Sequence, residues 1–432
     1  MRPAAFTAAL SFLVILGACA QTGTPPGSGA STNAPPYAGS RAGVCGAREY
    51  AATSSRASRV VTSLKVPNGF TIETIASIGD ARELAALPNG DLIVGTTGSN
   101  VYIVADAEGA AATPQVFASI NDSLAAGIAF TAARCEIYVA TENHVWRIPY
   151  HGERKASQVH KIADVRTGPI APGTDGDIHT TTSVAFTDGH VYAAAGSSCN
   201  ATMDNGKQPC TEVDPTRAAV SIMKPDGSDF NQRAKRVRNA IALAVNPETT
   251  SLWIGGAGQD DLPSGHPYEY LDDLSAHPGD ADYGWPVCEE NHHVYWPGYH
   301  CGKTVAPLVE LPAYSTIIGA TFYPLHQTGR YAFPSKYRGG LFAAAHGSWH
   351  TDRNGCNVDS PRVVFVAMKG DSPVKDVDWN DPTKQWSEFV TGFQSGCNAR
   401  IGRATGIAVG PKGSLFIADD RAGVIYRVRP TH

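Results

Sequence analysis

Residues 183–196 read SVAFTDGHVYAAAG, and this stretch predicts the fold. Two short apolar runs flank Asp188-Gly189, a dipeptide typical of the two-residue turn of a β-hairpin. The stretch therefore predicts one strand, a tight turn and a returning strand. Just ahead of it stands a lone histidine, His179, followed by three threonines.

The same order of an apolar triplet, a turn and two apolar strands returns along the chain. The copies lie at 84–104, 127–148, 183–196, 242–258, 319–347 and 406–428. Repeats built only from strands are typical of β-propellers, in which each repeat forms one four-stranded blade. We therefore expect an all-β chain folded as a six-bladed β-propeller of antiparallel blades. A pair of β-sandwiches is the alternative, but sandwich strands do not share one recurring motif.

The composition agrees with a fold made of strands. The 432 residues include 44 glycines and 29 prolines, and charged residues make up only 17%. These frequencies favour many short strands and turns over long helices. The 35 basic and 40 acidic residues give a formal net charge of −5, which gives no reason to expect nucleic acid as a partner.

The N-terminus has the features of an export signal. Arg2 provides a positive charge, and residues 4–16 form an apolar run too short to span a bilayer. The run ends in LGAC, which resembles the bacterial lipobox, so Cys19 would carry a lipid anchor to the membrane. An ordinary secretory signal with a chance cysteine is the alternative. The expected segments are a lipoprotein signal peptide at 1–19, a flexible tether rich in Gly, Ser and Pro at 20–60, and the propeller domain at 61–432.

The cysteines support export to an oxidising compartment. Of nine cysteines, eight remain when Cys19 is set aside for lipid, and an even number suits disulfides. We expect a periplasmic or outer-membrane lipoprotein, or a protein of the cell surface. The sequence leaves the pairing open, although four pairs would close two short and two longer loops: Cys199–Cys210, Cys288–Cys301, Cys356–Cys397 and Cys45–Cys135.

Polar residues concentrate in the loops between repeats, where a propeller gathers its binding residues. His179 is a candidate general base, because histidine titrates near neutral pH, and Asp177 could orient it. A histidine that only bonds to backbone at the start of a strand is the alternative. Asp122 could face the central channel, although a turn-forming Asn-Asp pair explains it as well.

Arginines and a tryptophan suggest a flat, anionic ligand. Arg236 and Arg238 are expected on one side of an extended strand before the fourth copy, and arginine binds planar carboxylates with two parallel bonds. A solvated basic turn is the alternative, and it suits Arg236 better than Arg238. Trp349 could stack on a ligand or pack in the core, and Arg400 and Arg403 offer positive charge.

Residues 255–285 hold seven acidic residues among glycines. Carboxylates and backbone carbonyls are the ligands that Ca²⁺ accepts, so this loop is a candidate calcium site. An acidic surface loop without metal is the alternative.

These loops, in this order, resemble the glucose/sorbosone dehydrogenase family over residues 64–430. The matching segments are HTTTSVAF (179–186), VRNAIALAV (237–245), GAGQDDL (256–262), DADYGWPVC (280–288), YRGGLFAAAHGSW (337–349) and GRATGIAVGPKGSLFIADDRAGVIYRV (402–428). The last three look most like the sorbosone dehydrogenase-like branch. The resemblance implies a six-bladed propeller that uses pyrroloquinoline quinone (PQQ) and Ca²⁺ to oxidise a sugar or a related aldose or polyol. Electrons would pass to an external acceptor.

The resemblance also implies roles for single residues. His179 matches the general base, and Ile178 stands where the family has an aspartate beside that base. The implied cofactor contacts are Arg238, Asn239 and Arg403, to which we add Asp122 at a glutamine position of the family, Glu269 near an acidic position, and Trp349. The implied calcium ligands are the carbonyl groups of Gly258 and Gln259.

Two other functions stay open. A calcium-dependent propeller lactonase would use the histidine and the ion to activate water. A non-catalytic surface propeller would bind a glycan or a protein at the same loops.

Overall fold

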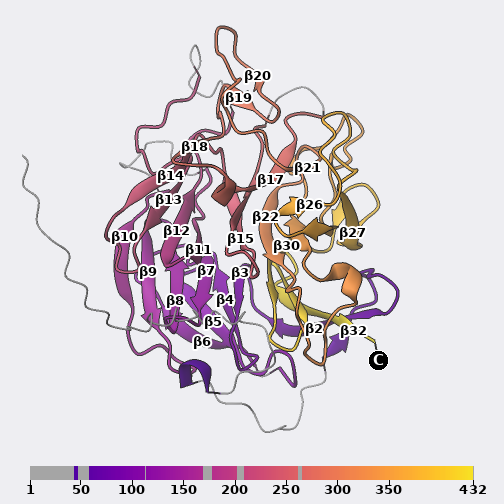
Figure 1. Cartoon of the computed structure of the whole chain (residues 1–432). Coiled ribbons are helices and arrows are strands. Elements are labelled where there is room, and N and C mark those ends of the chain that lie inside the picture. Colours follow the sequence, from indigo (N-terminus) through magenta and orange to yellow (C-terminus); the bar gives the residue numbers. More distant parts are fainter. Residues whose placement is uncertain are drawn as a thin grey trace, which may run out of the picture. The chain divides into compact units, whose positions relative to one another are not determined.

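The computed structural model describes residues 43–46, 58–111, 113–168, 178–201, 209–260 and 265–431. Within these residues, six sheets of four or five strands form the blades of a six-bladed β-propeller, as the repeats predict (Figure 1). The predicted signal peptide, Cys19 and most of the tether lie outside the described residues. None of the helices described is both long and apolar enough to cross a lipid bilayer.

The first three blades, in chain order and from the inner strand outward, follow the first three repeats. Blade 1 comprises β3 (Ala81–Ala86), β4 (Leu92–Thr96), β5 (Asn100–Val104) and β6 (Gln115–Ser119). Blade 2 comprises β7 (Gly127–Thr131), β8 (Glu136–Ala140), β9 (His144–Pro149) and β10 (His160–Asp164). Blade 3 comprises β11 (Ser183–Thr187), β12 (His190–Ala195), β13 (Ala219–Met223), β14 (Asn231–Lys235) and β18 (Ala281–Asp282), the last parallel to β14.

The last three blades follow the same plan. Blade 4 comprises β15 (Ala240–Val245), β16 (Leu252–Gly256), β17 (Glu269–Asp273) and β21 (Val309–Leu311). Blade 5 comprises β22 (Ile317–Phe322), β23 (Leu341–Ala345), β24 (Arg362–Val366) and β27 (Trp386–Val390). Blade 6 comprises β30 (Ala404–Val409), β31 (Leu415–Asp419), β32 (Val424–Pro430), β2 (Phe70–Ser77) and β1 (Arg59–Val60).

Short elements decorate these blades. Three two-stranded ribbons pair β19 (Cys288–Glu289) with β20 (His293–Val294), β25 (Met368–Lys369) with β26 (Ser372–Pro373), and β28 (Gln394–Ser395) with β29 (Ala399–Arg400). The single-turn helices are η1 (Val44–Gly46), η2 (Leu274–Ala276) and η3 (Ser335–Tyr337).

The hairpin that predicted the fold forms as expected. Thr187 pairs with His190 at the end of the β11–β12 ladder, so Asp188 and Gly189 make a two-residue turn. Both residues have positive φ, 48° and 75°, which is the geometry that an Asp-Gly turn adopts between twisted strands.

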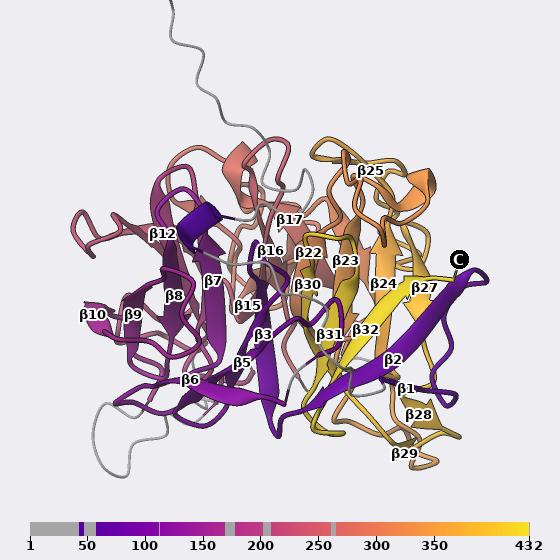
Figure 2. The same cartoon turned by 90° about the horizontal axis from the view of Figure 1, so that it is seen from below.

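An N-terminal strand closes the ring. Strand β2 pairs antiparallel with β32, so the N-terminal part of the domain completes the last blade (Figures 1 and 2). The buried Glu73 of β2 accepts hydrogen bonds from Arg427 at 2.8 Å and from Arg429 at 2.8 Å, both on β32. This ion pair joins the two ends of the domain by charge as well as by the ladder.

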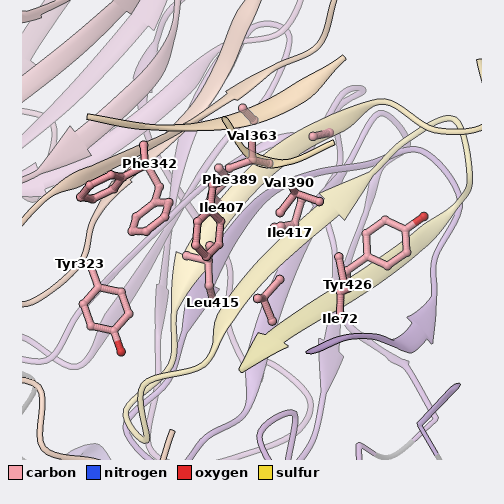
Figure 3. Packing of buried hydrophobic residues seen from close by; sticks show 14 of the residues in the cluster. Ile72, Tyr323, Phe342, Val363, Phe389, Val390, Ile407, Leu415, Ile417 and Tyr426 are labelled. Atoms are coloured by element: carbon pink, nitrogen blue, oxygen red, sulfur yellow. The ribbon is translucent and has the colours of Figure 1, made fainter. Parts of the chain in front are cut away.

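The core lies between the blades. Strand β23 (LFAAA) is buried at every residue, because a neighbouring blade covers each of its faces. The largest cluster joins blades 5 and 6, where Tyr323, Phe342 and Phe389 pack near Ile407 and Leu415 (Figure 3). Facing apolar sheets of this kind account for continuous apolar strands rather than strictly alternating ones.

Four disulfides brace the blades. They pair Cys45 with Cys135, Cys199 with Cys210, Cys288 with Cys301, and Cys356 with Cys397. These are the four pairs that would close two short and two longer loops. Disulfides in this number indicate an oxidising, exported location.

Candidate functional site

One rim of the propeller collects the candidate residues. Each inner strand begins opposite the end of the second strand of its blade: Ser183 pairs with Ala194, Ala240 with Gly256, Ile317 with Ala345 and Ala404 with Asp419. The residues before each inner strand and after each second strand therefore meet at the same end of the ring. Hydrogen bonds between neighbouring blades at this rim, described below, support that placement.

His179 lies on this rim with one ring nitrogen fixed. Its Nδ1 is 2.8 Å from the carbonyl oxygen of Ser197, and because a carbonyl can only accept, Nδ1 carries the proton. The lone pair is then on Nε2, the atom a general base uses. Burial, the Arg238 charge and the Arg217 charge lower the pKa of His179 to about 3, so the imidazole is neutral at physiological pH.

The group that orients His179 was not predicted from the sequence. Asp177 lies outside the described residues, and the bond to Ser197 comes from a residue 18 positions later. Arg217 fixes that carbonyl in turn: its Nη2 donates to Ser197 at 2.8 Å and to the Ile178 carbonyl at 3.1 Å. The side-chain hydrogen bonds of Arg217 reach residues 20 to 50 positions away, so no local pattern around it signals this role.

Arg238 and Asn239 stand beside His179. The Ser197 amide donates a hydrogen bond to the Arg238 carbonyl at 2.7 Å. The side chains of His179 and Asn239 both pack against Gly196, because a Cβ atom at this glycine would collide with each of them. The Arg238 guanidinium is buried; it donates to Asn200 at 2.6 and 2.8 Å and lies 3.6 Å from an Asp260 carboxylate oxygen. A fixed cation therefore faces the base from the next blade.

Arg236 does not share the side of Arg238. Its φ is +52°, so the backbone turns at this residue instead of running extended as expected. Its guanidinium pairs with Asp282 at 2.6 Å on the outer part of blade 3. The prediction of two arginines on one side was wrong, and the alternative of a basic turn holds for Arg236.

Trp349 and Arg403 lie on the same rim at blades 5 and 6, since Trp349 follows β23 and Arg403 precedes β30. The Arg403 guanidinium lies 4.1 Å from the centre of the Trp349 ring and donates to the carbonyls of His346 and Gly347 at 2.8 and 2.5 Å. Arg403 is 3% exposed, whereas Trp349 is 75% exposed. The tryptophan is thus held from below by a buried cation, and its outer surface is open to a flat ligand.

A second imidazole at this rim was missed by sequence reasoning. His346 Nε2 lies 3.0 Å from both carboxylate oxygens of Asp420, which also accepts from Arg82 at 3.0 Å. Burial lowers the pKa of His346 to about 4, against the opposing effect of Asp420. His346 directly follows the end of β23 and Asp420 directly follows the end of β31, and only the closed ring brings these two strand ends together.

The remaining candidates differ in their surroundings. The Asp122 carboxylate stays within blade 2, where it accepts from Thr141 at 2.6 Å and lies 2.7 Å from His144 Nδ1. Glu269 is buried at the start of β17 and accepts from the Ile317 amide at 2.9 Å, between blades 4 and 5. Burial raises the pKa of Glu269 to about 8.

Gly258 and Gln259 follow the end of β16, directly after the Ala257 carbonyl that faces Arg238 at 3.4 Å. A Cβ at Gly258 would meet the Pro267 ring at 2.7 Å, so close packing requires a glycine here. Across the described ranges, no three His, Cys, Asp or Glu side chains converge in an arrangement that could hold a metal ion. Among the described residues, an ion beside this turn would find carbonyl and amide oxygens with at most two carboxylates.

The starts of the inner strands surround a small cavity. A cavity of about 10 Å³, room for about one water molecule, is bordered by residues of all six inner strands or their starts. Its lining includes Arg82, Glu83, Thr182, Ile241, Ile318 and Thr405.

Comparisons with solved structures show that the fold is shared with sugar dehydrogenases. The PQQ domain of pyranose dehydrogenase from Coprinopsis cinerea, in its holo form, superposes with a TM-score of 0.66 at 17% identity, over 85% of this chain and 97% of that domain. The chain has the six-bladed fold of these dehydrogenases. The calcium structure of a carbohydrate-active enzyme of family AA12 from Trichoderma reesei gives a TM-score of 0.65 at 15% identity, over 88% and 99% of the two chains. A glucose dehydrogenase gives 0.58 at 16% identity, over 84% and 99%.

Sequence comparisons are less specific. No protein-family model matches the chain. An uncharacterized protein from Borreliella burgdorferi is 23% identical over 391 residues, which cover 86% of this chain and 92% of that protein.

Proposed function

We propose that this protein is a PQQ- and calcium-dependent oxidoreductase that oxidises a sugar or a related aldose or polyol. Electrons pass from the quinone to an external acceptor. The observation that carries the proposal is the joint position of three groups on one rim: the neutral base His179, the buried cation Arg238 and the open ring of Trp349 on Arg403. The shared fold with PQQ-containing and glucose-oxidising enzymes supports it.

The chemistry of the rim fits the quinone. PQQ is a planar tricarboxylate, so it needs cations and a flat apolar surface. Arg238 and Arg403 are the cations, Asn239 offers an amide beside His179, and the exposed side of Trp349 offers the flat surface. Asp122 is the weakest member of the proposed set, because its oxygens already serve Thr141 and His144.

The oxygens near Gly258 fit calcium. Ca²⁺ binds backbone carbonyls, amide oxygens and carboxylates. In our proposal the carbonyl groups of Gly258 and Gln259 are the ligands, and the carboxyl group of Glu269, at the start of β17, contributes to the same part of the site. When bound, the quinone accepts hydride and the ion polarises the quinone carbonyl.

The chain itself handles the proton. His179 Nε2 would remove the proton from the oxygen of the substrate hydroxyl group, while the carbon that bears this hydroxyl would lose a hydride, with its two electrons, to the bound cofactor. The substrate would thereby become a carbonyl compound or a lactone. Arg217 and the Ser197 carbonyl keep Nδ1 protonated and hold the ring in place. Burial and the charge of Arg238 lower the pKa of His179 and disfavour the imidazolium. The imidazole is therefore neutral before each turnover, and it releases the proton to solvent afterwards.

The test adds PQQ and Ca²⁺ to the metal-free protein and records the absorption spectrum before and after a panel of aldoses. We expect quinone binding at micromolar concentration and bleaching to the reduced form with at least one sugar. Absence of quinone binding at that concentration would refute the proposal. Hydrolysis of lactones without quinone would instead favour the propeller lactonase.

We further propose that Cys19 carries the lipid that holds the protein at a periplasmic or outer surface. The export signal before it and the oxidised cysteines support this placement. Mass spectrometry of the mature N-terminus tests it: a diacylglyceryl group on Cys19 is expected, and an unmodified N-terminus elsewhere contradicts it.

A further inference from the structure

The carbonyl group that orients His179 belongs to the peptide bond between residues 197 and 198. The Ser197 oxygen of this peptide bond lies 2.8 Å from His179 Nδ1. A trans peptide unit is planar, so its carbonyl group and the amide N–H of Ser198 point in opposite directions and cannot turn independently. A group that holds the Ser198 amide therefore also sets the direction of the carbonyl group at His179.

The carboxylate of Glu212 holds this amide. Its two oxygens lie 3.0 and 3.2 Å from the Ser198 nitrogen, and the Ser198 hydroxyl donates to Glu212 at 2.7 Å. The Ser197 hydroxyl donates to the same carboxylate. Hydrogen bonds to a carboxylate are roughly twice as strong as those between neutral groups, so Glu212 fixes the plane of this peptide bond.

A chain of hydrogen bonds thus runs from the Glu212 carboxylate through one peptide unit to the imidazole of His179. Each bond in such a chain polarises the next, because an acceptor that draws the amide proton leaves more negative charge on the carbonyl oxygen of the same peptide. The Ser197 oxygen is therefore a stronger acceptor for the Nδ1–H group than an isolated peptide carbonyl.

Ser197 is also held by other groups. Its hydroxyl oxygen accepts hydrogen bonds from the Trp285 indole at 2.9 Å and from the Cys199 amide at 3.0 Å, and Arg217 donates to its carbonyl oxygen at 2.8 Å. Burial lowers the pKa of Arg217, and the charge of Glu212 opposes this effect. Glu212 thus balances the charge of the buried cation that shares the Ser197 carbonyl with the base.

The disulfide between Cys199 and Cys210 keeps Glu212 close to this peptide bond. Cys199 directly follows Ser198, and Cys210 stands two residues before Glu212. The crosslink therefore limits how far the carboxylate can move from the Ser198 amide.

We infer that Glu212 is a positioning residue for the base His179. Through the peptide bond between residues 197 and 198 it holds the carbonyl group against Nδ1, so that the proton stays on Nδ1 and the lone pair stays on Nε2. The effect on turnover rests on the proposed function, whereas the effect on the tautomer of the imidazole does not.

The tautomer can be measured without quinone or substrate. In the full protein with isotopically labelled histidine nitrogens, nuclear magnetic resonance shows which ring nitrogen of His179 carries the proton at pH 7, and a His179→Gln sample identifies the signals. We expect protonated Nδ1 and unprotonated Nε2 in the native protein. Glu212→Gln removes the charge and one accepting oxygen, and it should shift the tautomer ratio about fivefold toward protonated Nε2.

The rate of sugar oxidation is the second readout. Glu212→Gln should lower kcat about tenfold, because a slightly misplaced catalytic group costs up to about 100-fold in rate, while KM for the sugar and the quinone affinity stay within about threefold. Glu212→Asp keeps the charge at a shorter reach and should recover part of the loss in both readouts. Dye reduction and quinone titration measure these effects.

Asp226→Asn is the matched control. Asp226 accepts hydrogen bonds from the Ser228 amide at 3.0 Å and from the Ser228 hydroxyl at 2.7 Å, in the turn between β13 and β14 of the same blade. The variant loses the same kind of contact at another place and should keep the native tautomer and the native kcat. Circular dichroism establishes that each variant is folded.

The outcomes separate this inference from the proposed function. A folded Glu212→Gln or Glu212→Asp variant with the native tautomer ratio overturns the inference, even if the native protein oxidises sugars. An equal change in Asp226→Asn also overturns it, because the effect is then a general loss of order in blade 3. A changed tautomer in a protein that binds no quinone leaves the positioning of His179 standing and refutes only the dehydrogenase.

Discussion

At the scale of single residues, two imidazoles face the rim with different partners. His179 bonds to a backbone carbonyl, whereas His346 bonds to the carboxylate of Asp420. Burial lowers the pKa of both, to about 3 and about 4, so each is neutral at pH 7. Within the described part of the chain, Nε2 of His179 has no hydrogen bond, whereas Nε2 of His346 lies 3.0 Å from Asp420. This difference is why we assign the base to His179.

Replacing His179 by glutamine should reduce kcat by a factor of about 100 to 10,000, because general-base catalysis contributes that much, while quinone binding stays within threefold. Steady-state dye reduction and quinone titration measure the two effects. His190→Gln, in the turn of the same hairpin, is the matched control and should keep native activity. A similar loss in both variants would show that the substitutions disturb the hairpin rather than the chemistry.

The acid side of the pH–rate profile should be flat for this base. A general base works when unprotonated, and the folded pKa of His179 is lowered to about 3, so acidification from pH 7 to pH 5 should not protonate it. The measurement is kcat/KM for the sugar across this range, with quinone saturation verified at each pH. A loss of activity centred near pH 6.5 would mean that an ordinary, solvated histidine is the base.

At the scale of elements, buried charge lies where the ring closes, both between blades 1 and 6 and between β2 and β32 inside blade 6. Arg82 of β3 pairs with Asp420 after β31, and Glu73 of β2 pairs with two arginines of β32. Both junctions involve the residues that close the ring. Removing one partner of a buried ion pair lowers the free energy of unfolding by about 3–5 kcal/mol, because the other charge is left buried without a partner.

Glu73 gives the β2–β32 junction a pH dependence with a defined sign. Burial alone would raise the pKa of Glu73, but the hydrogen bonds from Arg427 and Arg429 outweigh it, so the folded pKa lies below the ordinary value of 4.5. A lowered folded pKa means that the stabilisation is fully present above pH 4.5 and is lost as the pH falls through the folded pKa. Urea unfolding of Glu73→Gln should therefore show lower stability at pH 7 and a shallower decline below pH 4.5 than the native protein. Parallel curves for the two proteins would contradict this role.

At the scale of the molecule, two kinds of long-range connection stabilise the six-bladed ring: the β2–β32 ladder and the disulfides. The β2–β32 ladder joins sequence ends more than 350 residues apart, and the Cys45–Cys135 disulfide attaches η1 to blade 2 across a separation of 90. Segments inside the predicted 20–60 tether, η1 and β1, are thus bonded to the domain.

The disulfides should contribute according to loop length. Replacing Cys45 and Cys135 by alanine should cost about 4–5 kcal/mol, whereas replacing Cys199 and Cys210, only 11 positions apart, should cost about 3 kcal/mol. Urea unfolding at pH 7 compares the two double variants with the native protein. The reverse order would indicate that local strain or the Asn200 contact to Arg238, and not loop closure, dominates.

The sequence by itself determined the repeated hairpin, the six blades, the disulfide count and the position of His179, Arg238 and Arg403 at strand starts. Those properties follow from alternation, turn chemistry and the number of cysteines, all of which act between neighbours in the chain. The tertiary structure decided which groups touch: the Ser197 carbonyl with His179, Asp420 with His346 and Arg82, and Asp282 with Arg236. These contacts span 18 to 338 positions. These contacts form because the closed ring of six blades brings the starts of all inner strands to one rim. A local sequence pattern cannot specify contacts between residues so far apart in the chain.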